Sequence, residues 1–353
     1  MRVLFFTNRP YLPQKVGGAE SSTHAMIRAL EGRGNSCLVL CGLLPDGLIS
    51  LKNRVKRKLL KKDAPIDNVM GYRVARAWNA VAAILEIKSL FSPDVAVLLP
   101  SDGGMAKLAT PLNDESIPTV LHLRDVQFDS LGDPTTEPLA GIIANSHFTA
   151  DAFEQKYSIK PDVVYNIIDR EAYKTKAKGK YVTFINPVSK KGKDLAFYLA
   201  EQNPDIPFLF VEGWKLSTEQ KKLILERVQK SQNIVWMDRT QDMTKVYSKT
   251  RVLIVPSQWE EAWGRVVSEA HVAGIPVLAS QIGGLPESVG IGGKLIEPDD
   301  VEGWHNGLRA VWDDEEMWAR LSANAYEYGR RQELDVGAIV EKYENLLKLY
   351  VES

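Results

Sequence analysis

Two carboxylates, Glu261 and Glu269, lie eight positions apart around the predicted start of a helix. The run 251–255 predicts a buried strand, and residues 266–273 have helical spacing that ends at Gly274. Glu261 is therefore expected in the loop before the helix, and Glu269 about one turn inside it. The first amides of a helix are unpaired and, with the helix dipole, they favour a phosphate. A diphosphate with a hydroxyl-rich group on each side, as in a nucleotide-sugar, fits between the two carboxylates.

Two glutamates at this spacing are usually solvated surface residues, but their surroundings favour a binding site here. Three further segments support it: Pro256-Ser257, the turn Trp263-Gly264-Arg265 and the later pair Gly283-Gly284. Together they resemble the donor-binding signature of retaining glycosyltransferase family 4, the glycosyl transferases group 1. The resemblance implies an α/β protein of the GT-B fold, in which two Rossmann-like, doubly wound parallel-sheet domains face each other across a cleft.

The resemblance assigns roles to residues of the second half of the chain. It implies that Glu269 holds the ribose hydroxyls of the donor and that Glu261 holds the hydroxyls of the donor sugar. Backbone amides around the helix start and the later glycine pair are expected to contact the sugar or the diphosphate: Trp263, Gly264, Val266, Gly283 and Gly284.

Positive charge for the diphosphate is expected from the loop after the strand at 181–185. Surface lysines in loops are usually only solvated, but the family places an arginine and a lysine in this loop. Lys191 matches the lysine, whereas Pro187 stands where the arginine is expected. Arg265 is the candidate for the missing cation, and Lys190 is the second candidate.

The first half of the chain offers a glycine pair and a strand end. Gly17-Gly18 before a helix is by itself an ordinary turn, but family members carry a similar pair near the donor phosphates and the acceptor. The family also places a His-Asp pair after a strand, and Arg124-Asp125 aligns with it. The histidine is then absent or displaced to His122, which could equally be a core residue. Arg124 is expected to offer a fixed charge to the diphosphate or the acceptor.

Short apolar runs alternate with helical segments, which is typical of parallel sheets covered by helices. A polar, basic stretch predicts a linker near 168–180. We therefore expect two domains, at 1–168 and 169–335. The family resemblance implies that the first binds the acceptor and is joined by a C-terminal helix at about 336–353, and that the second binds the nucleotide-sugar donor. The predicted strands are 3–6, 38–40, 95–99, 119–123 and 141–144, then 181–185, 208–211, 234–236, 252–255 and 277–279.

Composition excludes several classes of protein. The chain has 353 residues and a net charge of −1, which argues against a general nucleic-acid binder. Cys37 and Cys41 are expected to be buried thiols rather than a disulfide, and the sequence offers no cluster of metal ligands and no Asp-x-Asp motif. We expect no metal and no cofactor. No apolar stretch is long enough to span a bilayer, so a cytoplasmic protein is expected.

One stretch, from Leu51 to Lys62, departs from this charge balance. Leu51, Val55 and Leu59 recur every four residues among seven positive charges. This pattern fits a basic amphipathic helix in peripheral contact with an anionic inner membrane surface. A solvated helix on the surface of the domain fits it equally well.

The resemblance implies a retaining hexosyltransferase of glycan or polysaccharide biosynthesis, and the lack of an Asp-x-Asp motif predicts that it is metal-independent. It would move a sugar from a nucleoside diphosphate to a carbohydrate or lipid-linked acceptor. A uridine, guanosine or adenosine donor fits the pattern equally. Two alternatives share the architecture: a nucleotide-sugar epimerase, and a non-catalytic nucleotide-sugar or glycan-binding protein.

Overall fold

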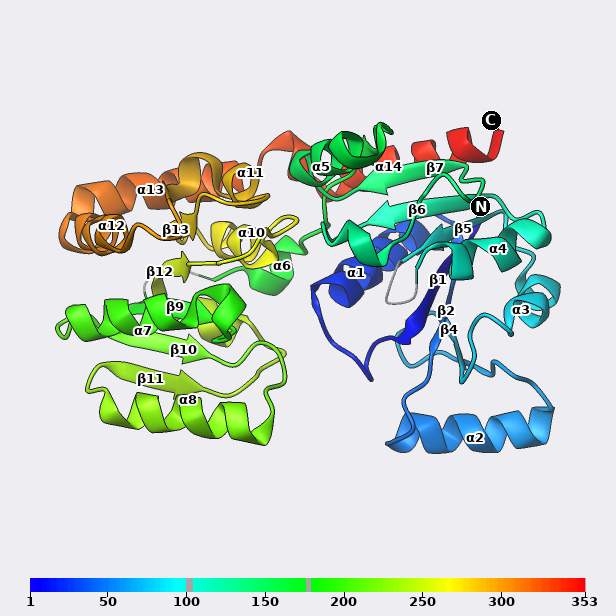
Figure 1. Ribbon diagram of the computed structural model, residues 1–353, viewed down its shortest axis with the longest axis horizontal. Helices are drawn as coiled ribbons and strands as arrows, with labels where there is room; N and C mark the ends of the chain where they lie inside the picture. Colours follow the sequence, from blue (N-terminus) through cyan, green and yellow to red (C-terminus); the bar gives the residue numbers. More distant parts are fainter. Residues whose placement is uncertain (100–103, 176–178, 353) are drawn as a thin grey trace. The chain divides into compact units, whose positions relative to one another are not determined.

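The computed structural model describes residues 1–99, 104–175 and 179–352, which divide into two compact units (Figure 1). Unit 1 comprises Met1–Ile167 and Val336–Ser353, and unit 2 comprises Ile168–Asp335. Residues 176–178 of the predicted linker lie outside the described residues. Each unit is built around its own sheet.

Unit 1 contains an eight-stranded sheet in the order β3-β4-β2-β1-β5-β6-β7-β8. All neighbouring strands are parallel except β3, which is antiparallel to β4. The chain winds outward from β1 in both directions, so the strand order reverses between β1 and β5. The carboxyl ends of strands at such a reversal form the usual ligand site of an open α/β sheet. The strands are β1 (Arg2–Pro10), β2 (Ser36–Gly42), β3 (Ile66–Asp67), β4 (Arg73–Ala77), β5 (Val95–Leu98), β6 (Thr119–Leu123), β7 (Gly141–Ala144) and β8 (Asp162–Val163).

Helices cover both faces of this sheet, because its strands alternate their side chains between two apolar layers. In β1, Leu4 and Phe6 pack into one buried cluster with α3, α4 and α5, whereas Val3 and Phe5 pack into another with α1 and α14. The helices of unit 1 are α1 (Gly18–Gly32), α2 (Leu48–Leu60), α3 (Ile84–Phe91), α4 (Ala106–Asp114), α5 (His147–Tyr157) and α14 (Val336–Glu352), with the short η1 (Phe128–Ser130).

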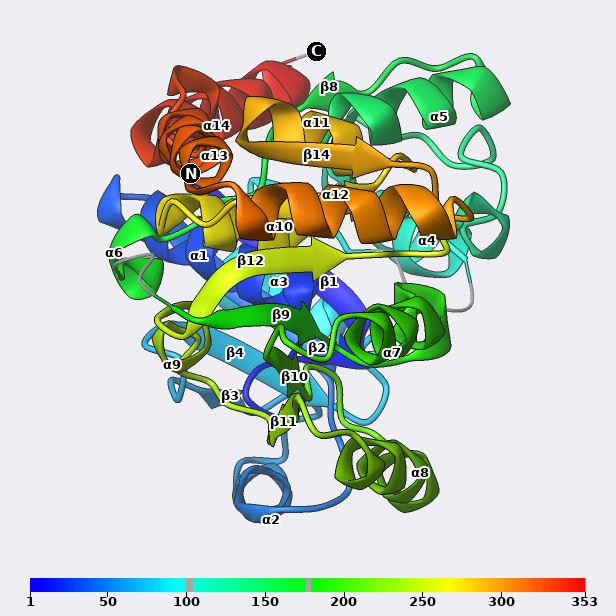
Figure 2. The same cartoon turned by 90° about the vertical axis from the view of Figure 1, so that its left-hand side faces the viewer.

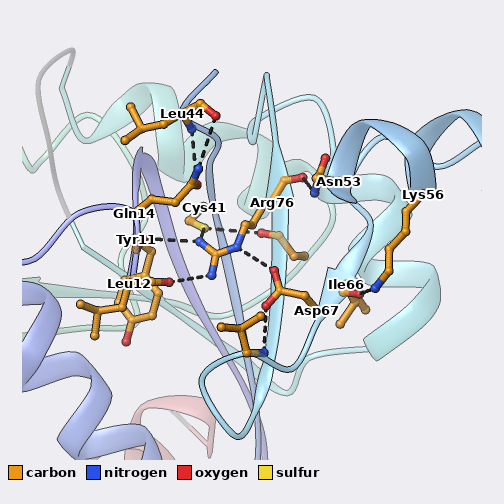
Figure 3. A network of polar contacts seen from close by, with 12 residues as sticks. Tyr11, Leu12, Gln14, Cys41, Leu44, Asn53, Lys56, Ile66, Asp67 and Arg76 are labelled. Atoms are coloured by element: carbon orange, nitrogen blue, oxygen red, sulfur yellow. Dashed lines mark hydrogen bonds and ion pairs between the residues drawn. The ribbon is translucent and has the colours of Figure 1, made fainter. Parts of the chain in front are cut away.

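A fully buried arginine, Arg76 in β4, fastens the loop after β1 (Figure 3). Its guanidinium donates to Asp67 Oδ2 at 2.7 Å and to the carbonyl oxygens of Leu12 at 2.6 Å and Tyr11 at 3.4 Å. A buried charge is tolerated only when it is paired and hydrogen-bonded. Arg76 therefore fixes the path of the chain between β1 and the glycine pair that precedes α1.

The C-terminal helix α14 belongs to unit 1 and is attached through a carboxylate. Glu344 accepts hydrogen bonds from Arg33 Nε at 2.8 Å and from Lys348 Nζ at 2.9 Å. These contacts, with Arg33 the larger contributor, lower the pKa of Glu344 to about 2. A depressed carboxyl pKa means that the ionised form stabilises the folded state.

We expect Glu344→Gln to lower the free energy of unfolding at pH 7 by about 1–2 kcal/mol. The stabilisation is fully present above the ordinary glutamate pKa of 4.5 and is lost as pH falls towards 2, so the deficit should shrink between pH 5 and pH 3. Urea unfolding of the variant and the wild type at pH 5 and at pH 3 measures this difference in the free energy of unfolding. Glu352→Gln, on an exposed residue of the same helix, is the control, and a deficit that does not change with pH would contradict the assignment.

Unit 2 contains a six-stranded parallel sheet in the order β11-β10-β9-β12-β13-β14, with its order reversal between β9 and β12. Figure 2 shows these two strands adjacent in the middle of the sheet. One face packs against α7, α8 and α12, and the other against α10 and α11. The strands are β9 (Tyr181–Ile185), β10 (Phe208–Val211), β11 (Ile234–Met237), β12 (Thr250–Val255), β13 (Val277–Ser280) and β14 (Gly293–Ile296).

The helices of unit 2 precede its first strand, connect its strands along the chain or follow its last strand. They are α6 (Arg170–Tyr173), η2 (Ser189–Lys191), α7 (Lys193–Gln202), α8 (Thr218–Lys230), α9 (Thr244–Tyr247), α10 (Arg265–Val272), α11 (Leu285–Val289), η3 (Gly290–Gly292), α12 (Val301–Asp313), α13 (Glu315–Tyr328) and η4 (Gln332–Leu334). The predicted fold class, two doubly wound parallel sheets, is confirmed. None of the helices in the described ranges has the length and hydropathy of a membrane-spanning segment.

Candidate functional site

The loops after β9 and β12 meet at the order reversal of unit 2 and bring Lys191 to Glu261. Lys191 Nζ lies 2.8 Å from Glu261 Oε1, and Ser257 Oγ donates to the same oxygen. Both charged side chains are largely buried, with about a tenth of each exposed. The pair therefore lies in a partly desolvated position, where charges act more strongly than in water.

Close backbone packing holds these two loops together. Gly192 has φ +80°, and a Cβ there would lie 1.8 Å from the carbonyl oxygen of Pro256. The amide of Gln258 donates to the carbonyl oxygen of Lys190 at 2.9 Å. Only glycine fits at position 192, because any side chain would separate Lys191 from the loop that carries Glu261.

Two tryptophans that the sequence analysis did not single out surround the lysines. Lys190 Nζ lies 3.9 Å from the ring centroid of Trp259 and 4.6 Å from that of Trp214. Lys191 Nζ lies 5.3 Å from both centroids. Cation–π contact of this kind orients the ammonium groups. Isolated tryptophans in loops give no sequence signal for such a role.

Glu269 lies one turn inside α10 and is held at both oxygens. Arg265 Nε donates to Oε1 at 2.8 Å, and the hydroxyl of Tyr247 donates to Oε2 at 2.7 Å. Arg265 also donates to the hydroxyl of Tyr173 at 3.2 Å. Burial and then the Glu269 carboxylate raise the pKa of Tyr247 well above its ordinary value, so its hydroxyl stays protonated. Arg265, the sequence-based candidate for a cation at the diphosphate, is paired with Glu269 in this structure.

The glycine pair Gly283-Gly284 packs directly on the Glu261 loop. Gly283 has φ +61°, and a Cβ there would lie 2.6 Å from the amide nitrogen of Glu261. The Gly284 amide donates to the Glu261 carbonyl oxygen at 2.6 Å. This contact fixes the backbone of Glu261, so the Gly284 amide is engaged within the protein.

The residues around the start of α10 have different surroundings. Gly264 is the N-cap, with φ +83°. The indole of Trp263 is buried and donates to Ser268 Oγ at 2.9 Å, whereas Val266 is partly exposed. The buried side chain of Trp263 thus stabilises the turn from the inside of the protein. A ligand at the helix start would contact the backbone of this turn rather than the indole.

Unit 1 has its own cavity, of about 170 Å³, at the order reversal of its sheet. The walls come from the carboxyl ends of β1, β5 and β6, the start of α1 and the segment around η1. Its lining includes both charged and apolar side chains: Thr7, Arg9, Tyr11, Glu20, Thr23, Leu99, His122, Arg124, Asp125 and Phe128. Such a mixture suits a hydroxylated or anionic ligand.

His122 and Arg124 form a coupled pair in this cavity. His122 is 2% exposed, and its Nδ1 lies 3.3 Å from an Arg124 terminal nitrogen and 3.2 Å from the Tyr343 hydroxyl. A guanidinium only donates, so Nδ1 is the acceptor and Nε2 carries the proton. Nε2 is buried and has no hydrogen-bond partner among the described residues. The pair thus presents one unused N–H donor.

We expect His122 to be neutral, in the Nε2–H tautomer, down to mildly acidic pH. Burial and then the Arg124 charge hold its pKa well below the ordinary value. Arg124→Met should raise this pKa, whereas Arg9→Met, on the same cavity, should leave it nearly unchanged. Nitrogen-15 NMR titration of the histidine ring measures both. A protonated His122 at pH 6 in the wild type would contradict this tautomer and charge state.

The remaining predicted residues of unit 1 lie at the same cavity or beside it. Gly17 is the N-cap of α1, in extended conformation, and a Cβ there would lie 2.6 Å from Glu20 Oε2. Gly18 begins the helix. Lys15 pairs with Glu20 at 2.9 Å, and Asp125 accepts from the Gln127 amide. The structure therefore gathers the predicted residues of unit 1 around one cavity.

The predicted site residues thus form two groups, one around the start of α10 in unit 2 and one around the cavity of unit 1. In the parts of the chain that the structure describes, no three His, Cys, Asp or Glu side chains gather as a metal site.

Comparison with known proteins finds a family model that matches the second half of the chain. Residues 166–328 match the family model of glycosyl transferases group 1. A stretch of 92 residues is 35% identical to D-inositol 3-phosphate glycosyltransferase of Corynebacterium efficiens. This stretch covers 26% of the chain and 22% of the length of that relative.

Solved structures resemble the chain over its whole length. Anabaena Alr3699/HepE in complex with UDP-glucose has a TM-score of 0.78 and 20% identity, and the match covers 99% of both chains. Sucrose-phosphate synthase from Thermosynechococcus elongatus has a TM-score of 0.75 and 14% identity, with all of both chains covered. At these identities the likeness shows the fold, which is GT-B.

Proposed function

We propose that this protein is a retaining glycosyltransferase of family 4 that transfers a hexosyl group from a nucleoside diphosphate to a carbohydrate or lipid-linked acceptor. The observation that carries the proposal is the arrangement at α10 of unit 2. There, Glu261 is paired with Lys191 before the helix, and Glu269 is held one turn inside it. The match to the group 1 family model over this unit supports it.

The donor occupies unit 2 in this proposal. Glu269 accepts from the ribose hydroxyls, and Arg265 and Tyr247 orient its carboxylate. Glu261 accepts from the hydroxyls of the donor sugar. The diphosphate lies at the start of α10, within reach of Lys191, because helix amides and a cation both favour an anion there.

Transfer breaks the bond between the anomeric carbon and the diphosphate oxygen and forms one to an acceptor oxygen on the same face. Negative charge grows on the leaving diphosphate, and Lys191 with the helix amides stabilises it. The acceptor proton goes to the departing phosphate. This route needs neither a protein base nor a metal ion.

The acceptor occupies the cavity of unit 1 in this proposal. His122 donates from Nε2 to an acceptor oxygen, and the charge of Arg124 favours an anionic or hydroxylated group. Gly17 and Gly18 give the ligand close access to the backbone at the start of α1. In this proposal the protein works in the cytoplasm.

The test begins with a thermal-shift screen against nucleotides and nucleotide-sugars. Binding to the folded state raises the melting temperature by an amount set by ligand concentration over affinity. Release of nucleoside diphosphate from the stabilising donor, with and without candidate glycans and a chelator, then measures transfer. We expect release that depends on an acceptor and survives the chelator.

Other outcomes select other functions. A nucleotide-sugar that binds without release identifies a non-catalytic binding protein. A donor sugar that changes configuration without an acceptor identifies an epimerase. No shift with any nucleotide would contradict all three functions.

A further inference from the structure

Helix α2 of unit 1 presents its apolar side chains outward. Leu48, Leu51, Val55 and Leu59 are 74%, 59%, 51% and 76% exposed. At about 100° per residue, these four positions lie within roughly 80° of one another around the helix. Its buried residues, Ser50 and Asn53, lie on the opposite side. A helix packed on its own domain shows the reverse arrangement. We call these four side chains the apolar row.

Polar contacts, rather than the apolar row, hold α2 on unit 1 (Figure 3). Asn53 Nδ2 donates to the Arg76 carbonyl oxygen at 3.1 Å, and Lys56 Nζ donates to the Ile66 carbonyl oxygen at 3.1 Å. In both views α2 lies at the edge of unit 1 (Figures 1 and 2). The helix is therefore fixed in place with its apolar row unused.

Basic side chains border the apolar row on both sides. Lys52 and Lys56 follow one side of it around the helix, and Arg54 and Lys58 follow the other. No acidic residue occurs between Leu51 and Lys62. Of the seven basic residues in this stretch, only Arg57 makes an ion pair within the described residues, with Asp63 at 2.9 Å. The positive charge around the apolar row is thus largely unneutralised.

We propose that α2 docks on a lipid bilayer with anionic headgroups, with the apolar row inserted at the level of the upper acyl chains and the lysines at the headgroup phosphates. Interfacial helices combine these two features. A nucleic acid or an acidic protein would use the charges and leave the leucines in water. An apolar protein surface would bury the leucines, but it would also remove the basic side chains from water without offering them a partner, which is unfavourable. A bilayer with anionic headgroups accommodates the apolar row and the basic side chains at the same time.

Sedimentation with vesicles tests the docking. The full chain should bind vesicles of phosphatidylcholine with phosphatidylglycerol at low salt, and bind less at high salt or to phosphatidylcholine alone. Replacing Leu51, Val55 and Leu59 together by glutamine should lower the partition coefficient by at least about a hundredfold. Replacing Lys52, Lys56 and Lys58 by glutamine should lower it by about a hundredfold.

A second exposed helix supplies the matched control. Leu223 on α8 is also exposed, at 61%, beside Lys222. Changing both to glutamine should leave vesicle binding unaltered. All the altered leucines and valine are more than half exposed, so the melting temperatures should stay at the wild-type value.

A single fluorescent label separates insertion from electrostatic adsorption. Cys37 and Cys41 are buried, as the sequence predicts, and burial raises their thiol pKa to about 12. Leu59→Cys therefore provides a selectively labelled thiol. A polarity-sensitive fluorophore there should shift to the blue on anionic vesicles and be quenched by spin-labelled lipids, whereas the same label in Leu223→Cys should not.

Three results would overturn the proposal. They are equal binding to neutral and anionic vesicles, full binding by the glutamine variant of the apolar row, and a label at position 59 that remains in water on bound protein. None of these measurements needs a donor or an acceptor. The docking can therefore fail while the proposed transferase activity stands, and the reverse also holds.

Discussion

Replacing Lys191 by methionine should lower kcat by roughly a hundredfold or more, the size of effect seen when one preorganised donor to a developing charge is removed. Lys191 is paired with Glu261 and lies largely out of water. In the proposed mechanism it supplies the positive charge at the position where leaving-group charge grows. Methionine keeps the length and much of the volume of lysine while removing only the charge. Initial rates of nucleoside diphosphate release at saturating donor measure the effect.

Lys222→Met is the matched control, because Lys222 is exposed on α8 and makes only a weak contact of 3.9 Å with Glu226. It should keep the wild-type rate. A rise in KM with unchanged kcat would show that Lys191 binds the donor equally in the ground and transition states. An unchanged kcat and KM in a stably folded Lys191→Met would remove Lys191 from the mechanism.

Much of the fold can be predicted from the sequence, because parallel strands buried on both faces read as continuous apolar runs. All ten predicted strands overlap strands of the structure. The strands that were missed are β3, β4, β8 and β14. The residues of β4 show the reason, because Arg73 and Arg76 interrupt its apolar pattern. Arg76 is tolerated in the core because Asp67 neutralises its charge and two carbonyl oxygens accept its remaining hydrogen bonds. Partners of that kind are set by tertiary structure.

The candidate site was only partly predictable for a similar reason. Residues that share a local segment, such as Glu261 and Glu269, follow from strand, loop and helix signals. The hydroxyl of Tyr247, which holds Glu269, comes from another element, 22 positions earlier. The direction of Arg265 depends on the nearest carboxylate, which lies one turn away on the same helix. Sequence spacing allowed this i,i+4 pair, but it did not choose between Glu269 and a ligand phosphate.

The direction in which α2 faces was likewise undecided by sequence. Its periodic leucines fit a solvated helix on the domain surface and a helix in contact with a membrane equally well. The structure excludes burial on unit 1, because Ser50 and Asn53 occupy the inner side of the helix. The orientation of α2 depends on Arg76 and Ile66, whose carbonyl oxygens accept hydrogen bonds from Asn53 and Lys56 on the polar face of the helix.

Glu261→Gln and Glu269→Gln should separate sugar recognition from nucleotide recognition. Glu261→Gln should lower turnover by about tenfold or more and leave the affinity for free nucleoside diphosphate near the wild-type value. Glu269→Gln should weaken that affinity by about tenfold or more. Both magnitudes follow from the loss of a hydrogen bond to a charged group, about 1.5–3 kcal/mol.

Calorimetric titration with the nucleoside diphosphate and initial rates with the full donor measure the two effects. Glu260→Gln is the matched control, because Glu260 is the exposed neighbour of Glu261 and should show neither effect. Glu269 is also tied to Arg265 and Tyr247, so its variant must retain the wild-type melting temperature before the affinity is interpreted. If the two losses were exchanged, the donor would bind in the opposite orientation. If both variants kept full activity, α10 would not be the donor site, because a carboxylate that contacts the substrate cannot lose its charge without a change in rate or affinity.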